Sequence, residues 1–128
     1  MNSFIFSLGI LAISISPLFS DPIPVLTTNS SQSHILYTKT TDFQPDELPL
    51  AKEIGESLIQ SLALYGSAAG LAAPQIGISR SVFIYSNNRD PKNLEIIINP
   101  SFSPIGTETL EGWEGCFSVE LRLVKVSM

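Results

Sequence analysis

The chain has 128 residues, of which 44% are apolar and 15% are charged, and its formal net charge is -5. This length suits one domain, and the composition is that of a globular rather than a disordered protein. The negative charge and the lack of a Lys/Arg cluster argue against a nucleic-acid partner. The single cysteine excludes an internal disulfide, and the single histidine, His34, excludes a site built from two imidazoles of this chain.

Residues 1–20 form an apolar N-terminal segment that resembles a secretory signal peptide. Residues 4–15 carry no charge, and Ser20 places a small residue before Asp21. The run is short for a membrane span. The first three residues lack Lys and Arg and Leu18 is large for a cleavage site, so an apolar extension is the alternative. We expect export or membrane targeting, with membrane contact only through an uncleaved segment, if this is a signal peptide, and a cytoplasmic or organellar location otherwise.

The rest of the chain, residues 23–128, is predicted to be one α+β domain with a long helix near its start. Residues 34–37 favour a short strand. Residues 45–65 are predicted to form the helix, because apolar side chains recur every four positions and Gly66 follows as a stop signal. The apolar stripe is Leu50, Ile54, Leu58 and Leu62.

Four segments after the helix favour strands, namely residues 81–85, 94–98, 107–110 and 116–126. The first two are predicted to form a hairpin, because a polar turn at residues 87–91 separates them. No long helix alternates with these strands, so the sheet is predicted to be mostly antiparallel.

The first of two short motifs is Ala68-Ala69-Gly70-Leu71-Ala72-Ala73-Pro74-Gln75, a run of small residues that ends in one amide. Small residues let the backbone approach another backbone or a ligand. A tight loop between the helix and the first strand explains the run as well as a binding site does. The motif contains neither GK[ST] nor GxGxxG, which excludes a phosphate-binding loop.

The second motif, residues 111–119, reads EGWEGCFSV and contains Cys116. A free cysteine is usually a small buried apolar residue, and Cys116 taken alone is best interpreted in this way. Together, however, the two motifs resemble those of the peptide deformylases, GxGLAAPQ and EGCxS, in the same order and about 40 residues apart. The segment Ile97-Ile98-Asn99-Pro100 between them is also similar to the family, and the resemblance covers approximately residues 23–119.

The resemblance implies a peptide-deformylase-like α+β fold with a mostly antiparallel sheet and one long N-terminal helix. The implied activity is metal-dependent hydrolytic removal of the formyl group from N-formylmethionyl peptides, a step of protein biosynthesis. In the family one Cys and the two His of an HExxH helix hold a divalent metal, Fe²⁺ or Zn²⁺. Such a metal makes its bound water nucleophilic near neutral pH.

The resemblance also assigns roles to residues of this chain. Cys116 is the implied metal ligand. The side chain of Gln75 and the backbone N–H of Phe117 are the implied donors to the oxyanion of the reaction intermediate. Gly70 and Leu71 are the implied substrate-binding residues.

Two further residues of the second motif complete these expectations. Glu114 is expected to brace the motif rather than to act as the base, and no role follows for Ser118.

The sequence departs from the family in one major respect, because it contains no HExxH. It ends at Met128, before the metal-binding helix is expected, and Ala68 replaces the first glycine of the first motif. We therefore expect a partial domain that does not retain a metal and is inactive alone, for which a separate HExxH-containing fragment would be a partner. The alternative is an exported, non-catalytic peptide-binding protein or the remnant of an enzyme gene.

Overall fold

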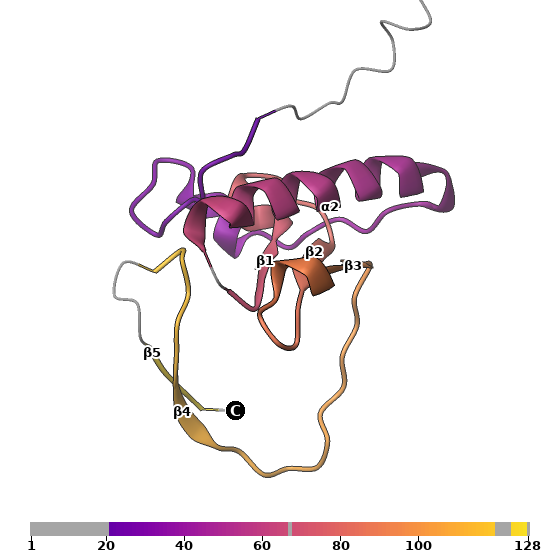
Figure 1. Cartoon of the computed structure of the whole chain (residues 1–128). Coiled ribbons are helices and arrows are strands. Elements are labelled where there is room, and N and C mark those ends of the chain that lie inside the picture. Colours follow the sequence, from indigo (N-terminus) through magenta and orange to yellow (C-terminus); the bar gives the residue numbers. More distant parts are fainter. Residues whose placement is uncertain (1–20, 67, 120–123, 128) are drawn as a thin grey trace, which may run out of the picture.

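The computed structural model describes residues 21–66, 68–119 and 124–127, so the predicted signal peptide lies outside the described residues. One long helix, α2, packs against a small antiparallel sheet, and a second two-stranded sheet lies apart from it (Figure 1). The elements are η1 (Ser33–Tyr37), η2 (Pro45–Glu47), α2 (Leu48–Leu62), η3 (Ala63–Tyr65), β1 (Gly70–Ala72), η4 (Ala73–Ile76), β2 (Val82–Tyr85), η5 (Pro91–Asn93), β3 (Glu95–Ile98), β4 (Glu111–Glu114) and β5 (Val124–Ser127), where η marks a 3-10 helix. None of the helices in the described ranges has the length and apolar character needed to cross a membrane.

The predicted helix at residues 45–65 is confirmed as a continuous run of η2, α2 and η3. A proline in the first turn of α2 suits a helix start, because its missing N–H would lack a helical partner there. The apolar stripe faces the sheet, where Ile54, Leu58 and Leu62 are buried. Gly66 ends the run with a φ of 76°, a conformation that favours glycine.

The main sheet has the order β1-β2-β3, and both pairs are antiparallel. The predicted hairpin is therefore confirmed as β2 and β3, with the turn at residues 87–91 between them. Alternate residues of β2, Val82 and Ile84, point into the core against α2. Among the described strands, β1 pairs only with β2, which makes it an edge strand of this sheet.

Three of the predicted strands differ from the observed structure. Residues 34–37 lie in η1, which is held by local bonds such as Ile35 N–H to Gln32 O rather than by a neighbouring strand. Residues 107–110 have no regular structure, and β4 begins only at Glu111. In the strand predicted at residues 116–126, residues 116–119 form a turn instead, residues 120–123 lie outside the described residues, and residues 124–126 do lie in a strand, β5. β1, in contrast, was not expected from the sequence.

We call the described residues between 21 and 99 the body and those between 100 and 127 the arm. Residues 100–110 loop away from β3, and the turn after β4 then returns to the body (Figure 1). Asn99 stands at the junction with a φ of 51°. Its side-chain Oδ1 accepts a 2.8 Å hydrogen bond from the N–H of Phe43, and its Nδ2 donates a 2.9 Å bond to the Phe43 carbonyl.

Candidate functional site

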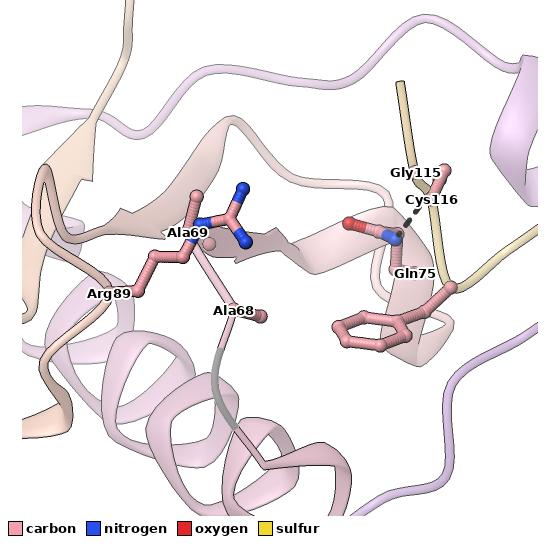
Figure 2. A pocket seen from close by; sticks show the side chains of 8 residues that line it. Ala68, Ala69, Gln75, Arg89, Gly115 and Cys116 are labelled. Atoms are coloured by element: carbon pink, nitrogen blue, oxygen red, sulfur yellow. Dashed lines mark hydrogen bonds between the residues drawn. The ribbon is translucent and has the colours of Figure 1, made fainter. Parts of the chain in front are cut away.

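A cavity of about 430 Å³ lies where the first motif faces the second (Figure 2). This volume is within the range of small-ligand sites. Its lining combines the loop before β1, the turn before β2, the turn between β2 and β3, and the turn after β4. The lining residues are Ala68, Ala69, Gly70, Gln75, Arg89, Gly115, Cys116 and Phe117.

The open edge of β1 forms one wall of this cavity. The N–H of Ser86 donates to the carbonyl of Ala69 at 2.8 Å, which continues the pairing of β1 with β2 by one residue. In an antiparallel pair, alternate residues turn their N–H and C=O toward the partner and away from it. Gly70 follows Ala69, so its two backbone polar groups face away from β2, on the edge where the cavity lies. Gly70 also has no room for a side chain, because a Cβ there would collide with the carbonyl oxygen of Ile84.

Gln75 lies in η4, directly after β1, and its side chain turns back to the strand. Its Oε1 accepts a 2.9 Å hydrogen bond from the N–H of Ala72. Its Nε2 donates to Ser118 Oγ at 3.1 Å and makes a longer contact of 3.9 Å with Cys116 Sγ (Figure 2 shows the latter). The backbone of Gln75 is also fixed, since its carbonyl accepts from Leu26 N–H at 2.7 Å. The oxygen and the nitrogen of the Gln75 side-chain amide therefore each have a partner that fixes the orientation of the group.

Cys116 and Ser118 come from the turn after β4, which the N–H of Val119 closes by donating to the Cys116 carbonyl at 3.1 Å. The thiol of Cys116 is exposed at the cavity. Ser118 is 5% exposed, and its carbonyl accepts a 2.8 Å bond from Thr28 N–H. Sequence reasoning gave Ser118 no role, because its partner Gln75 lies 43 residues away in the chain and no local pattern marks the pair.

Phe117 separates these two residues and packs on the body. Its ring lies 5.0 Å from the ring of Tyr65, measured between centroids. The hydroxyl of Tyr65 in turn accepts a 2.8 Å hydrogen bond from Val25 N–H, which fixes the ring. The Phe117 N–H therefore lies in a turn that is anchored on both sides. Its expected role as an oxyanion donor stays a prediction.

The other residues expected from the sequence lie in different surroundings. Leu71 is 3% exposed and packs in the core, and its backbone N–H and C=O, like those of Ala69, face β2. Its expected substrate-binding role stays a prediction. Glu114 is exposed at the end of β4, opposite Val124 of β5, and its expected bracing role stays a prediction. His34 lies on η1 and does not line the cavity.

Arg89, which the sequence analysis did not single out, is the only residue with a permanent charge among the described residues that line the cavity. It lies in the turn between β2 and β3. Charged turn residues are common, and no sequence pattern marked this one.

The described residues do not make a complete metal site. No three His, Cys, Asp or Glu side chains in the described ranges gather closely enough to hold a metal ion. Cys116 is the one side chain of these types in the cavity lining. The described part of the site thus offers one exposed thiol, one oriented amide donor and an open strand edge.

Comparisons with known proteins agree on one family. A family model described as polypeptide deformylase matches residues 24–127. Peptide deformylase 2 of Rickettsia conorii is 46% identical over 68 residues, which are 42% of this chain and 33% of that protein. Peptide deformylase 1 of Nitrosomonas europaea is 38% identical over 76 residues, which are 50% of this chain and 42% of that protein. The matched segment therefore spans about a third to two fifths of these curated relatives.

Solved structures are similar over more of the chain. The Met-Ala-Ser-bound crystal structure of a class I type b peptide deformylase from Acinetobacter baumannii matches with a TM-score of 0.68 at 26% identity. The match covers 84% of this chain and 71% of that one. Peptide deformylase from Thermotoga maritima matches with a TM-score of 0.66 at 27% identity, over 84% of this chain and 68% of that one.

Proposed function

Because the chain belongs to the polypeptide deformylase family, whose model matches residues 24–127, we propose that its cavity binds the start of an N-formylmethionyl peptide. The observation that carries this proposal is the oriented amide of Gln75 beside the thiol of Cys116. The two groups come from different motifs, 41 residues apart in the chain. They meet at one end of a cavity whose wall is an open strand edge.

The strand edge suits the backbone of a peptide. Gly70 presents an N–H and a C=O on the side of β1 that no other described strand covers, and an extended peptide can pair with both. The formyl end would then lie near Gln75, just beyond the end of β1, and the peptide would run antiparallel to the strand. The Acinetobacter baumannii relative supports this proposal, because its crystal structure is that of a complex with Met-Ala-Ser.

The end of the cavity near Gln75 suits an oxygen that gains negative charge. Gln75 Nε2 has two hydrogens, of which one is held by Ser118 Oγ at 3.1 Å. The other points toward Cys116 Sγ at 3.9 Å, which is a long and weak contact. A ligand oxygen that replaces this contact gains a stronger hydrogen bond. We infer that this N–H and the backbone N–H of Phe117 are the donors for the oxyanion of deformylation.

The family is metal-dependent, and Cys116 is the group of this chain that would supply a ligand. A divalent metal held there would supply an activated water as the nucleophile for the formyl group. The described residues add no second and third ligand, and the sequence contains a single histidine. We therefore propose that this chain alone holds Fe²⁺ or Zn²⁺ weakly and does not hydrolyse formyl-methionyl peptides, and that an HExxH-containing fragment would be needed for turnover.

The test separates binding from turnover. Titration of the full chain with formyl-Met-Ala-Ser, followed by NMR of the peptide, should show binding that Gly70→Val abolishes, since its side chain would collide with β2. Gln60→Ala, at an exposed position of α2, is the matched surface control. Formate release in the presence of added Fe²⁺ or Zn²⁺ should equal the buffer background.

Two results would contradict the proposal. Absence of peptide binding would remove the assignment of the cavity. Formate release that survives repurification and is lost in both Gln75→Ala and Cys116→Ala would show that the chain is active alone. The alternative of an exported, non-catalytic protein depends on residues 1–20, outside the described residues, and no observation here favours it.

A further inference from the structure

Arg89 lies at the end of the cavity opposite to Gln75 and Cys116 (Figure 2). It also borders a smaller cavity of about 90 Å³, whose lining is mostly apolar and includes Ile59 and Leu62 of α2. An arginine commonly lays its aliphatic part along an apolar surface and keeps its guanidinium in a polar one. In Figure 2 the side chain reaches past Ala69 toward the main cavity.

The turn that carries Arg89 is held by specific hydrogen bonds. Ser86 Oγ donates to Asn88 Oδ1 at 2.9 Å, and Asp90 N–H donates to the same oxygen at 3.0 Å. The N–H of Ser86 binds Ala69 of the cavity wall. Arg89 itself has a φ of 59°, which residues with a side chain adopt rarely and which surrounding structure must impose. The guanidinium is thus carried on an ordered turn that is fastened to the cavity.

The position of Arg89 along the cavity sets what it can contact. A peptide that runs antiparallel to β1 from Gln75 passes Ala72 first and Ala68 last. With its first residue paired to Gly70, its third residue lies opposite Ala68, about 7 Å further along the strand. Ala68 lines the cavity together with Arg89, so the third residue comes next to the turn that carries Arg89. A guanidinium has five N–H donors and binds a carboxylate with two of them. Arg89 already takes part in another interaction within the protein, and a bound carboxylate would be added to it.

We propose that Arg89 is a specificity-determining residue that binds a carboxylate at the third residue of the peptide. The carboxylate is either the C-terminal group of a tripeptide or the side chain of an acidic third residue. Because the chain carries a net charge of -5, an acidic ligand would otherwise be repelled, and this one cation reverses the preference locally. The inference rests on the proposed peptide site and adds a preference to it.

Four peptides test the inference with the full chain in low salt at pH 7. Formyl-Met-Ala-Ser is compared with its C-terminal amide, and formyl-Met-Ala-Glu-amide is compared with formyl-Met-Ala-Gln-amide. Each Kd is measured by NMR titration of the peptide. The acidic member of at least one pair should bind about fivefold more tightly, the size expected of a partly exposed ion pair. High salt should reduce the ratio.

Three variants locate the effect, and thermal unfolding checks that each is folded. Arg89→Gln should bring the ratio close to one, and Arg89→Lys should keep part of it. Lys92→Gln is the matched control, because it removes the same charge from the same connection at an exposed position outside the cavity lining, and it should keep the full ratio.

The outcomes separate the inference from the function on which it rests. Binding of all four peptides with ratios near one would overturn the role of Arg89 and leave the peptide site standing. Ratios that persist in Arg89→Gln would also overturn it. No binding of any peptide would overturn the peptide site itself, and the inference with it. The pair that shows the effect identifies the source of the carboxylate.

Discussion

The body and the arm differ in how far their apolar side chains are exposed to solvent. All fully buried apolar residues of the described chain belong to the body, among them Leu58 and Ile84, each 0% exposed. The arm leaves several of its large apolar residues in solvent, among them Phe102 at 95% and Ile105 at 100% exposure. The body therefore has a core that holds it together, while the position of the arm depends on a few contacts.

The candidate site lies across this division, which makes those few contacts important. Gly70, Gln75 and Arg89 come from the body, and Cys116 comes from the arm. The return of the arm is fixed by the Ser118 bonds to Gln75 and Thr28 and by the ring contact between Phe117 and Tyr65. A stable fold and an assembled site therefore have separate requirements in this chain.

Truncation of an apolar side chain should change the free energy of unfolding far more in the body than in the arm. Leu58→Ala should lower the free energy of unfolding by about 2–5 kcal/mol, because it leaves a cavity between α2 and the sheet. Ile105→Ala, which removes a fully exposed side chain, should change it by less than about 0.5 kcal/mol. Urea unfolding followed by circular dichroism measures both. A loss in Ile105→Ala as large as in Leu58→Ala would show that the arm has its own buried partner in solution.

The junction of the two regions should give the next largest effect. Asn99→Ala removes both hydrogen bonds to the Phe43 backbone and should cost about 1–3 kcal/mol in the same urea experiment. Asn87→Ala, in an exposed turn, is the control and should have little effect. If the two variants unfolded alike, Asn99 would not fasten the start of the arm to the body.

The contact between Ser118 and Gln75 should be weaker but specific. In a double-mutant cycle of Ser118→Ala and Gln75→Ala, the coupling energy should be about 0.5–1.5 kcal/mol, the net value of one hydrogen bond. Hydrogen exchange of the Thr28 N–H, which binds the Ser118 carbonyl, should speed up in Ser118→Ala. Additive single mutants together with unchanged exchange would mean that this bond does not hold the arm.

The smallest expected effect is a change in the pH dependence of stability below pH 4.5, and it involves Glu47 of the body. The pKa of Glu47 is lowered because its carboxylate accepts from the Gln44 N–H and pairs with Arg80 at 3.1 Å. A lowered folded pKa adds stability above the unfolded value of about 4.5, and this stability is lost as the pH falls through the folded pKa. Thermal unfolding of Glu47→Gln should therefore depend less on pH below 4.5 than that of Glu53→Gln, an exposed-residue control. Equal pH profiles would contradict this.

The sequence predicted the body better than the arm because the body is encoded by local apolar patterns. The repeat from Leu50 to Leu62 marks the helix that packs on the sheet, and the run at residues 94–98 marks β3. β1 escaped prediction because its three residues are too few to show a period. In the arm, residues 107–110 have strand-like composition, but no strand in the described ranges pairs with them, and composition alone does not provide a partner.

The candidate site was predicted in part, through the resemblance of its two motifs rather than through any physical pattern. That resemblance singled out Gln75 and Cys116, which the structure brings to within 3.9 Å. Ser118 was missed because the partner of a hydroxyl 43 residues away leaves no local signature. Arg89 was missed because the sequence of its turn carries no pattern that indicates a neighbouring cavity.

The bond from the Ala72 N–H to Gln75 Oε1 has a consequence for the electric potential inside the cavity. If the side-chain amide of Gln75 were flipped, its NH₂ group would face the N–H of Ala72, and two donors would meet. The backbone of β1 therefore permits only the orientation in which Oε1 faces Ala72. The face toward Cys116 is therefore electropositive, and it stays so at every pH because an amide does not titrate. A glutamate in the same place would keep the bond to Ala72 and the shape of the side chain, yet it would present an anionic oxygen to the sulfur. The N–H of Ala72 in β1 thus decides the polarity of the end of the cavity near Gln75.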